Sequence, residues 1–183
     1  MNINTQFDEI ATYLHDRMVG MTEPAQRVYL HDLLAENNRK LNALFVLYGV
    51  PWDMIGQIRN VAYRQHFAGL DAPALAKQYQ VPRAKLTDFM NAEALEGCVI
   101  RAMQTENTMG RGKVRTPKAA LDIHRNIAAA LRLYLIDNGY ARPETLLPAG
   151  ESVESVRKRL AHGGDLFNLS GLDDDDDEPQ EVC

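Results

Sequence analysis

Apolar residues recur along most of this chain three or four positions apart, which is the spacing of one face of an α-helix. A first run of this kind covers residues 7–18 and ends before Gly20, and a second covers residues 22–48. The alternation of apolar and polar residues that indicates a β-strand is nearly absent. The pattern therefore predicts an all-α protein that begins with a helical N-terminal region.

Residue types at the predicted helix ends support this interpretation. Thr22 and Thr116 are each followed within two residues by a proline. Threonine is a good N-cap, and proline fits the first turn of a helix because its missing N–H has no helical partner there anyway. Further helices are predicted over residues 52–67, 92–107, 117–138 and 153–160, with two short helices within residues 71–90.

Length and composition place the chain among ordinary soluble proteins, with 183 residues, 45% of them apolar and 25% charged. No run of about eighteen apolar residues occurs, and the N-terminus lacks the basic patch and apolar core of a signal peptide. We therefore expect a cytoplasmic protein, in the host cytoplasm if it is viral, with no membrane partner. Cys98 and Cys183 have neither the number nor the spacing of a disulfide framework or a metal site.

The formal net charge of −5 is unevenly distributed along the chain. Residues 1–55 hold four Lys or Arg and seven Asp or Glu, residues 56–135 hold twelve and six, and residues 136–183 hold four and twelve, so the local sums are −3, +6 and −8. A polyanion such as nucleic acid would be attracted to the basic middle segment. The charge distribution thus makes this segment the candidate binding region.

The segment DAPALAKQYQVPRAKLTDFM, residues 71–90, has the pattern of a helix-turn-helix motif. Ala76 supplies the small residue at which the two helices would cross. Pro82 would open the second helix, which would enter a major groove of DNA as residues 82–91. The turn position that usually holds glycine is Gln80, where a left-handed backbone would cost about 1 kcal/mol.

The outward side of the predicted second helix is basic, and other cations lie close by in sequence, which favours DNA binding. Arg83, Lys85 and Thr87 are the first candidates to contact bases or phosphates, and Arg64, Lys77 and Arg59 are candidates for contacts with the DNA backbone. The alternative is that residues 71–90 are only two packed helices, since any helical protein contains such pairs.

A second basic cluster lies in MGRGKVRTPK, residues 109–118, which interrupts the helical pattern with two glycines and a proline. Arg111, Lys113 and Arg115 could contact phosphates there, because glycine lets the backbone approach a ligand closely. The segment also fits a solvated connection between two helices. It is no P-loop, which requires GKS or GKT after its glycines.

The helices over residues 92–107 and 117–138 are joined by a short loop and should pack as an antiparallel hairpin, a common oligomerisation unit. The second helix carries more apolar residues than one partner helix could cover, so we expect the subunits of a homo-oligomer to meet there. The residues expected at this interface are Leu121, Ile127, Leu131, Tyr134 and Leu135.

The C-terminal part of the chain is strongly acidic, with five consecutive aspartates at residues 173–177. These charges repel one another and cannot be buried, so residues 172–183 are predicted to be disordered. The predicted organisation is a helical region at residues 1–56, a helix-turn-helix DNA-binding domain at 57–92, the hairpin at 93–140, and a linker, short helix and acidic flexible tail at 141–183.

The sequence predicts no catalysis, no metal and no cofactor. Its five histidines are scattered, and no pair has the spacing of a metal site or of a catalytic triad. The run of aspartates lacks the alternating ligands and the glycine of a calcium-binding loop. A binding protein is therefore expected instead of an enzyme.

The order of a helix-turn-helix carried by ALAKQYQVPRAKL, an antiparallel hairpin and an acidic C-terminus resembles that of the small terminase subunits of tailed phages. The resemblance implies that the chain recognises viral double-stranded DNA for packaging and assembles into rings through the hairpin. It also implies that the tail engages a large, ATP-hydrolysing motor subunit.

Two alternatives remain open. The first is a transcription regulator that binds an operator as a dimer, with residues 7–48 or the hairpin as the dimer contact. The second is a helical adaptor that does not bind DNA, whose acidic tail mimics DNA or captures a basic partner. The three hypotheses differ in DNA binding and in the number of subunits.

Overall fold

The computed structural model describes residues 2–112 and 114–163. In this part of the chain every regular element is helical, which confirms the all-α fold. The α-helices are α1 (Ile3–Met18), α2 (Glu23–Leu47), α3 (Ile55–His66), α4 (Ala72–Tyr79), α5 (Ala92–Arg111), α6 (Pro117–Asp137) and α7 (Val153–Ala161). Short 3-10 turns lie between them: η1 (Trp52–Met54), η2 (Arg83–Lys85), η3 (Thr87–Phe89) and η4 (Pro143–Thr145).

Side-chain caps begin two of the helices where the sequence predicted them. The Thr22 hydroxyl accepts a hydrogen bond from the N–H of Ala25 at the start of α2, at 3.4 Å. Thr116 caps α6 in the same way by accepting from Ala119, at 3.1 Å. Proline occupies the first turn of both helices. These local signals explain why both starts could be predicted.

The end of α5 lies later than the sequence predicted. A break was expected after Asn107, but the helix continues to Arg111, and the N–H of Gly112 still donates to the carbonyl of Thr108. Glycine within a helix costs only about 1 kcal/mol relative to alanine. Met109 is fully buried in this last turn, and its packing offsets that cost.

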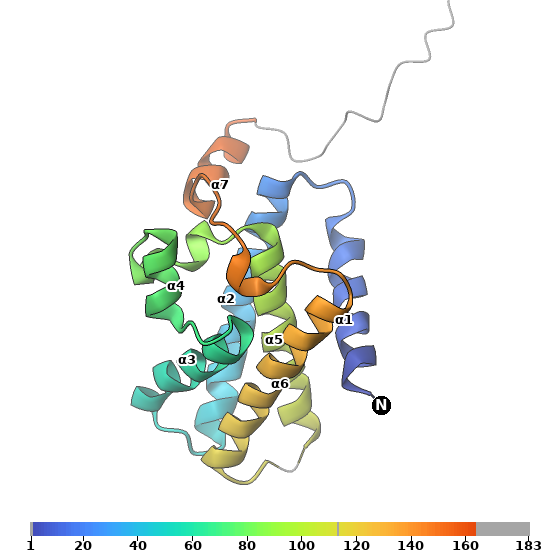
Figure 1. Ribbon diagram of the computed structural model, residues 1–183, viewed down its shortest axis with the longest axis vertical. Helices are drawn as coiled ribbons and strands as arrows, with labels where there is room; N and C mark the ends of the chain where they lie inside the picture. The colour runs from blue at the N-terminus through green and yellow to red at the C-terminus, as the bar shows by residue number, and fades with distance from the viewer. Residues whose placement is uncertain (1, 113, 164–183) are drawn as a thin grey trace, which may run out of the picture.

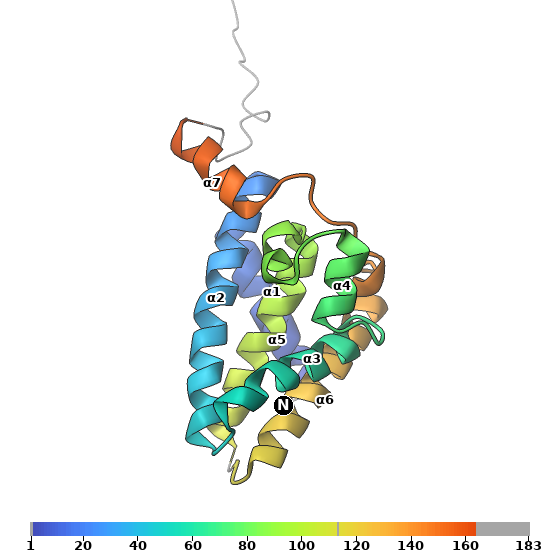
Figure 2. The same ribbon diagram turned by 90° about the vertical axis from the view of Figure 1, so that its left-hand side faces the viewer.

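α5 lies at the centre of the fold, and the other long helices pack around it (Figure 1). α1, α2 and α6 contact α5 directly, α3 packs across α6, and the short α7 packs against α2. Figure 2 shows α3 and α4 on the near face of the molecule, with α1 behind α5. α7 lies at one end of the molecule, and the connection between α5 and α6 lies at the other.

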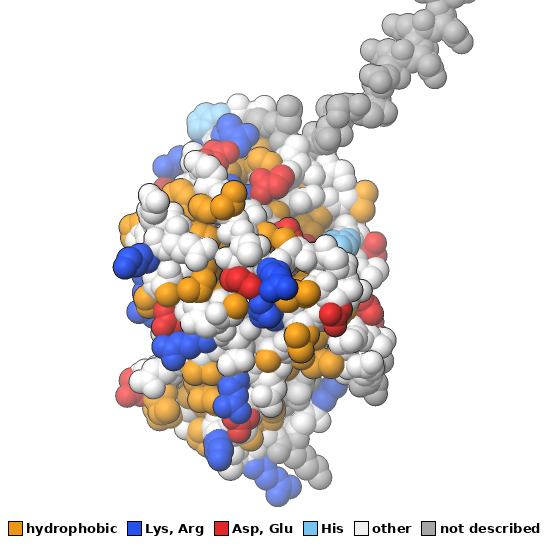
Figure 3. Space-filling view, viewed as in Figure 1, with side chains coloured by type: hydrophobic (Ala, Val, Ile, Leu, Met, Phe, Trp, Pro, Cys, Tyr) orange, Lys and Arg blue, Asp and Glu red, His pale blue; other side chains and the backbone are white. Residues whose placement is uncertain are grey.

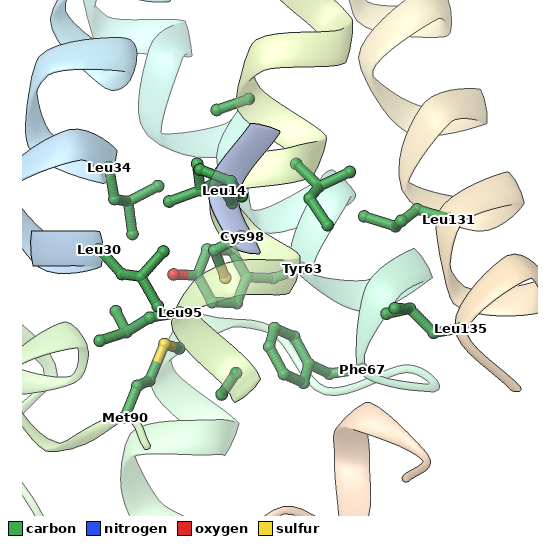
Figure 4. Close-up of a cluster of buried hydrophobic side chains, with 14 of the residues drawn as sticks. Leu14, Leu30, Leu34, Tyr63, Phe67, Met90, Leu95, Cys98, Leu131 and Leu135 are labelled. Atoms are coloured by element: carbon green, nitrogen blue, oxygen red, sulfur yellow. The ribbon is translucent and has the colours of Figure 1, made fainter. Parts of the chain in front are cut away.

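Two clusters of buried apolar side chains form the core. The larger cluster gathers residues from α1 to α6, and Figure 4 shows Leu30, Tyr63, Cys98 and Leu131 from four of these helices meeting within it. The smaller cluster surrounds Phe45, near the end of the molecule where α5 connects to α6. The helices that flank residues 71–90 therefore share one core with the N-terminal helices.

The apolar surplus of α6, which predicted a contact between subunits, is covered within this chain. α5, α3 and α1 all pack against α6. Ile127, Leu131, Tyr134 and Leu135 are buried in the larger cluster, and Leu121 packs, partly buried, against the smaller one. The pattern correctly indicated several neighbours for α6, but these neighbours belong to the same chain. A homo-oligomer remains a prediction that requires another surface.

The predicted second helix of the helix-turn-helix does not form. α4 ends at Gln80, whose left-handed backbone (φ 59°, ψ 38°) provides the expected turn, but residues 81–91 contain only η2 and η3. At the end of this segment the buried guanidinium of Arg27 binds the carbonyls of Asp88 and Met90, at 2.9 and 3.0 Å. These carbonyls would have no partner inside a helix that ended at residue 91, so Arg27 fixes the end of the segment.

Three expectations concern residues outside the described ranges. These are the disorder of residues 172–183, the contact of the tail with a motor subunit, and the phosphate contact of Lys113. Within the described ranges, no helix is both long and apolar enough to cross a membrane.

Candidate functional site

An open groove of about 180 Å³ lies between α3 and the two 3-10 turns that follow α4. Three of the residues predicted to contact DNA, Arg59, Arg83 and Thr87, meet in it. The full lining consists of Gly56, Arg59, Asn60, Tyr63, Ala72, Arg83, Leu86 and Thr87. Segments that are distant in sequence thus form one concave surface.

Helical spacing arranges the α3 side of the groove. Gly56, Arg59 and Tyr63 lie three or four residues apart and therefore share one face of the helix. A Cβ at Gly56 would meet no atom within 4 Å, so the groove is open at this end. Nη2 of Arg59 donates to Oδ1 of Asn42 on α2 at 2.8 Å, which holds the guanidinium beside the groove.

The opposite side of the groove depends on the left-handed turn at Gln80. The N–H groups of Gln80 and Val81 both bond back to carbonyls of α4, which reverses the chain. Leu86 is then buried in the core, while Arg83 stays exposed at the rim. Arg83 forms no ion pair with a described carboxylate. Asp71, whose pKa is lowered chiefly by Arg64 and to a smaller extent by the charge of Arg83, is paired with Arg64.

A third arginine, Arg101 of α5, lies beneath the groove. Only 5% of its surface is exposed, and its guanidinium carbon is 4.8 Å from the centre of the Tyr63 ring, which lines the groove. Its Nε and Nη1 atoms have no hydrogen-bond partner among the described residues. A buried charge without a counter-ion costs several kcal/mol. Arg101 thus adds a buried positive charge beside the groove, where it contacts Tyr63 and Cys98 but no carboxylate of the described residues.

The groove is electrostatically positive. It contains no Asp or Glu among its lining residues, whereas Arg59, Arg83 and Arg101 bring three cations to it. Burial lowers the pKa of Arg59, and repulsion by Arg101 acts in the same direction. Arginine nevertheless stays protonated in proteins, so these charges persist and repel each other. An anion with several oxygen acceptors, such as phosphate, would relieve this repulsion.

Two of the other predicted DNA contacts are already paired. The ammonium group of Lys85 lies 3.1 Å from Asp88 and 3.7 Å from Glu154. Arg64 forms an ion pair with Asp71, the N-cap of α4, at 2.9 Å. Binding of a phosphate by either cation would have to compete with these carboxylates.

The remaining predicted contacts do not line the groove. Lys77 is exposed on α4, five residues after Ala72, the residue of that helix that borders the groove. Arg111 and Arg115 are exposed near the connection between α5 and α6, at the end of the molecule farthest from α7 (Figure 1). The structure thus divides the predicted basic residues between two separate regions.

Sequence reasoning missed Asn60, Tyr63 and Arg101. Arg101 could have been recognised, because it interrupts the apolar run in CVIRAM on a helix that was expected to pack in a hairpin. Asn60 and Tyr63 carry no such signal. Their place in the groove depends on how residues 83–87 fold over α3.

The histidines do not form a second site in the described part of the chain, where no group of three or more His, Cys, Asp or Glu could hold a metal ion. Burial lowers the pKa of His66 well below its ordinary value, and that of His124 to about 3. Nδ1 of His124 lies 2.9 Å from Oγ1 of Thr105, as expected of a packed core residue. The absence of catalysis stays a prediction.

Comparison with known proteins supplies a family. Residues 21–156 match the DinD C-terminal domain. The DNA damage-inducible protein D of Escherichia coli (strain K12) is 24% identical to this chain over 160 residues. That alignment covers 86% of this chain and 58% of the relative, so the chain spans less than two thirds of the relative's length. No solved structure matches.

The matched range contains every residue of the groove, and Arg101 beneath it. Neither match concerns a phage terminase, and that resemblance stays a hypothesis. Since the match extends over well more than half of the 183 residues, this chain belongs to the family of the DinD C-terminal domain.

Proposed function

We propose that this chain binds nucleic acid, and double-stranded DNA in the first place, through phosphate contacts in the groove between α3 and η2. The observation that carries the proposal is the meeting of Arg59 and Arg83 in a groove without acidic lining residues. The buried Arg101, which has no carboxylate partner among the described residues, lies close by against Tyr63. Guanidinium groups bind phosphate oxygens in bidentate geometry, and such bonds are strong where water is partly excluded. The name of the relative says only that DNA damage induces that protein.

The groove favours contacts with the phosphate backbone over the reading of base edges. Readout in the major groove requires a helix or a two-stranded ribbon, and residues 81–91 provide neither. Asn60 and Thr87 add neutral hydrogen-bonding groups beside the arginines, a type of group that commonly binds phosphate and sugar. Binding should therefore depend strongly on salt and only weakly on DNA sequence.

Two possible roles of the protein require DNA binding, and they differ in the number of subunits that assemble. Recognition of viral DNA for packaging, implied by the resemblance to small terminase subunits, requires a ring of many subunits. Operator binding by a transcription regulator requires a dimer. Light scattering on the full chain separates the two, whereas the adaptor hypothesis requires that the chain bind no DNA at all.

Removal of either groove arginine should weaken DNA binding. We expect Arg59→Ala and Arg83→Ala each to raise the Kd for a labelled duplex roughly tenfold, about 1.4 kcal/mol, because each loses a charge-assisted bond to phosphate. The slope of log K against log salt should fall by about one for each arginine removed. Fluorescence anisotropy at low salt measures both quantities.

The matched control is Arg17→Ala. Arg17 lies on α1, on the other side of the molecule from the groove, and its removal changes the net charge by the same amount (Figure 2). The Kd of the Arg17→Ala variant for the duplex should equal that of the parent chain. Equal Kd values for all three variants would exclude the groove as the binding site. A parent chain that binds no duplex at low salt would leave the adaptor hypothesis standing.

Arg101→Met should separate binding from stability. Methionine fills a similar volume without a charge, so it removes a buried cation that has no carboxylate partner among the described residues. We expect the free energy of unfolding to rise by roughly 1–3 kcal/mol. DNA affinity should fall at the same time, because the cation beneath the groove is lost. Urea unfolding and anisotropy on the same preparation test both. A variant that is less stable than the parent would show that Arg101 serves the fold instead of a ligand.

A further inference from the structure

Exposed apolar side chains concentrate at the end of the molecule where α2 passes into η1. Val46, Leu47, Trp52 and Met54 are exposed by 36%, 74%, 67% and 38%. They are four of the eight large apolar side chains that are exposed in the described part of the chain, within a segment of nine residues. Contiguous exposed apolar surface of this kind marks interaction sites.

An apolar pocket of about 240 Å³ adjoins this segment. Its lining comes from the segment itself, from α3 and from the start of α6: Val50, Met54, Ile58, Pro117, Lys118 and Leu121. Lys118 is the only charged residue among them. Figure 3 shows hydrophobic side chains gathered at the lower left, over the start of α3, with Lys and Arg side chains at their edge.

The neighbourhood of the pocket is basic. Arg111 and Arg115 are exposed on the connection that leads to Lys118, and none of the three forms an ion pair with a described carboxylate. Asp53 of η1 is the acidic residue of the exposed segment. A partner that places apolar side chains in the pocket and carboxylates beside these cations would match both the shape and the charge of this surface.

This chain contains a segment of that chemistry. Residues 164–178 read GDLFNLSGLDDDDDE, in which four large apolar residues precede five aspartates and a glutamate, and residues 164–183 contain no Lys or Arg. The binding of nucleic acid in the groove uses neither this segment nor the pocket. We propose that the C-terminal segment of one copy of the chain docks in the apolar pocket of a second copy. Phe167 and its apolar neighbours fill the pocket, and the aspartates lie against the basic connection.

Distance favours a second copy over the same chain. Arg157 of α7 pairs with Asp32 of α2, and Leu47 lies fifteen residues farther along α2, about 22 Å away. Phe167 follows Gly163 by only four residues, which span at most about 14 Å. Figures 1 and 2 show α7 at the opposite end of the molecule from the connection between α5 and α6. Phe167 therefore falls short of the pocket of its own chain.

Such a contact joins two different surfaces, so each copy offers both a free tail and a free pocket. Contacts of this kind close into rings or extend into open chains. This surface would provide the self-association that the buried side chains of α6 cannot. The inference does not depend on nucleic-acid binding, and its test contains no nucleic acid.

The test uses the full chain and its single tryptophan, Trp52. Sedimentation velocity should show association that increases with protein concentration, and Trp52 emission should move to shorter wavelength as the residue is covered. A synthetic peptide of residues 164–178, added to dilute protein, should produce the same shift. We expect Met54→Glu in the pocket, and Phe167→Ser with Leu169→Ser in the tail, each to weaken self-association at least about tenfold. Leu147→Glu, on another exposed apolar residue, should leave it unchanged.

Several results would overturn the proposal. Self-association that survives the paired Phe167→Ser and Leu169→Ser change would show that copies meet without the tail. The peptide could also bind to the Met54→Glu protein as well as to the parent, and lose binding only when its five aspartates are replaced with asparagine. That result would show that the peptide is held by charge alone, outside the pocket. A chain that stays monomeric, and whose Trp52 does not respond to the peptide, would show that the pocket has another occupant.

Discussion

Lowering the pH from 7 to 5 should destabilise this protein by about 4 kcal/mol, because two histidines are buried where they cannot accept a proton. Burial lowers the pKa of His66 well below its ordinary value of 6.5, and that of His124 to about 3. In the unfolded chain both side chains titrate near 6.5. Each therefore takes up a proton on unfolding at pH 5, which favours the unfolded state by roughly 2 kcal/mol per histidine.

The surroundings of His124 account for the depressed pKa. The Thr105 hydroxyl donates to the carbonyl of Arg101 at 2.8 Å, so it accepts from Nδ1 of His124 at 2.9 Å, and the imidazole is neutral with its proton on Nδ1. After burial, the charges of Arg101 and Arg59 are the further causes that lower the pKa. The cations that make the groove positive thus also oppose protonation of this core histidine.

The sign of the effect follows from the direction of the two shifts. Because the folded pKa values lie below the unfolded ones, stability is complete above pH 6.5 and falls as the pH decreases toward the folded values. Glu96 acts in the opposite direction, since burial raises its pKa against the opposing charge of His15, and its protonation favours the folded state. Glu96 offsets part of the loss of stability at low pH, so histidine variants are needed to measure the contribution of the histidines separately.

Urea unfolding at several pH values measures this effect. The free energy of unfolding should change by about 2.5 kcal/mol per pH unit between pH 6 and pH 5. His124→Gln should remove about half of this slope, because one of the two protons taken up on unfolding is lost. His162→Gln, which changes an exposed histidine at the end of α7, should leave the slope unchanged. If the free energy of unfolding of His124→Gln changed with pH as steeply as that of the parent, His124 would not be one of the groups that take up a proton on unfolding.

Most of the helices could be predicted because each carries its own periodicity and end signals. Thr22 and Thr116 cap helices where the sequence predicted helix starts. Each cap involves only a threonine and the N–H group three residues later, so it is a local feature of the sequence. The excess of apolar residues on α6 also predicted that several neighbours cover it. The identity of those neighbours could not be read, since a stripe of buried residues looks the same whether its partner is α3 of the same chain or another subunit.

Residues 82–91 show what a local pattern cannot determine. They carry the proline start and apolar spacing of a helix, yet they form two short turns. Arg27, which lies more than fifty residues earlier, holds the end of the segment through the carbonyls of Asp88 and Met90, a contact that no local pattern indicates. The same distinction applies to the candidate site. Arg59, Arg83 and Thr87 could be named from residue type and charge, but their meeting in one groove, with Arg101 buried close by against Tyr63, depends on tertiary packing.

Arg27→Ala should reduce the free energy of unfolding by about 3–5 kcal/mol. Arg27 is only 1% exposed, and its guanidinium donates to the carbonyls of Met90, Asp88 and Glu151 at 3.0, 2.9 and 2.7 Å. One side chain of α2 thus holds both the segment after α4 and the segment before α7. Alanine would leave a cavity and three carbonyls without their donor, and each unpaired buried acceptor costs about 1–3 kcal/mol. Urea unfolding measures the total loss.

Two further variants identify the cause. Arg27→Lys keeps the charge, but a single ammonium cannot reproduce the fork that reaches all three carbonyls, so about half of the loss should remain. Arg157→Ala is the matched control, because it removes an exposed ion pair with Asp32 that joins the same two helices, α2 and α7, and should cost at most about 1 kcal/mol. Hydrogen exchange should show faster opening of residues 83–90 and of α7 in Arg27→Ala alone. If Arg27→Ala cost no more than Arg157→Ala, the three hydrogen bonds of Arg27 would not hold the two segments in place.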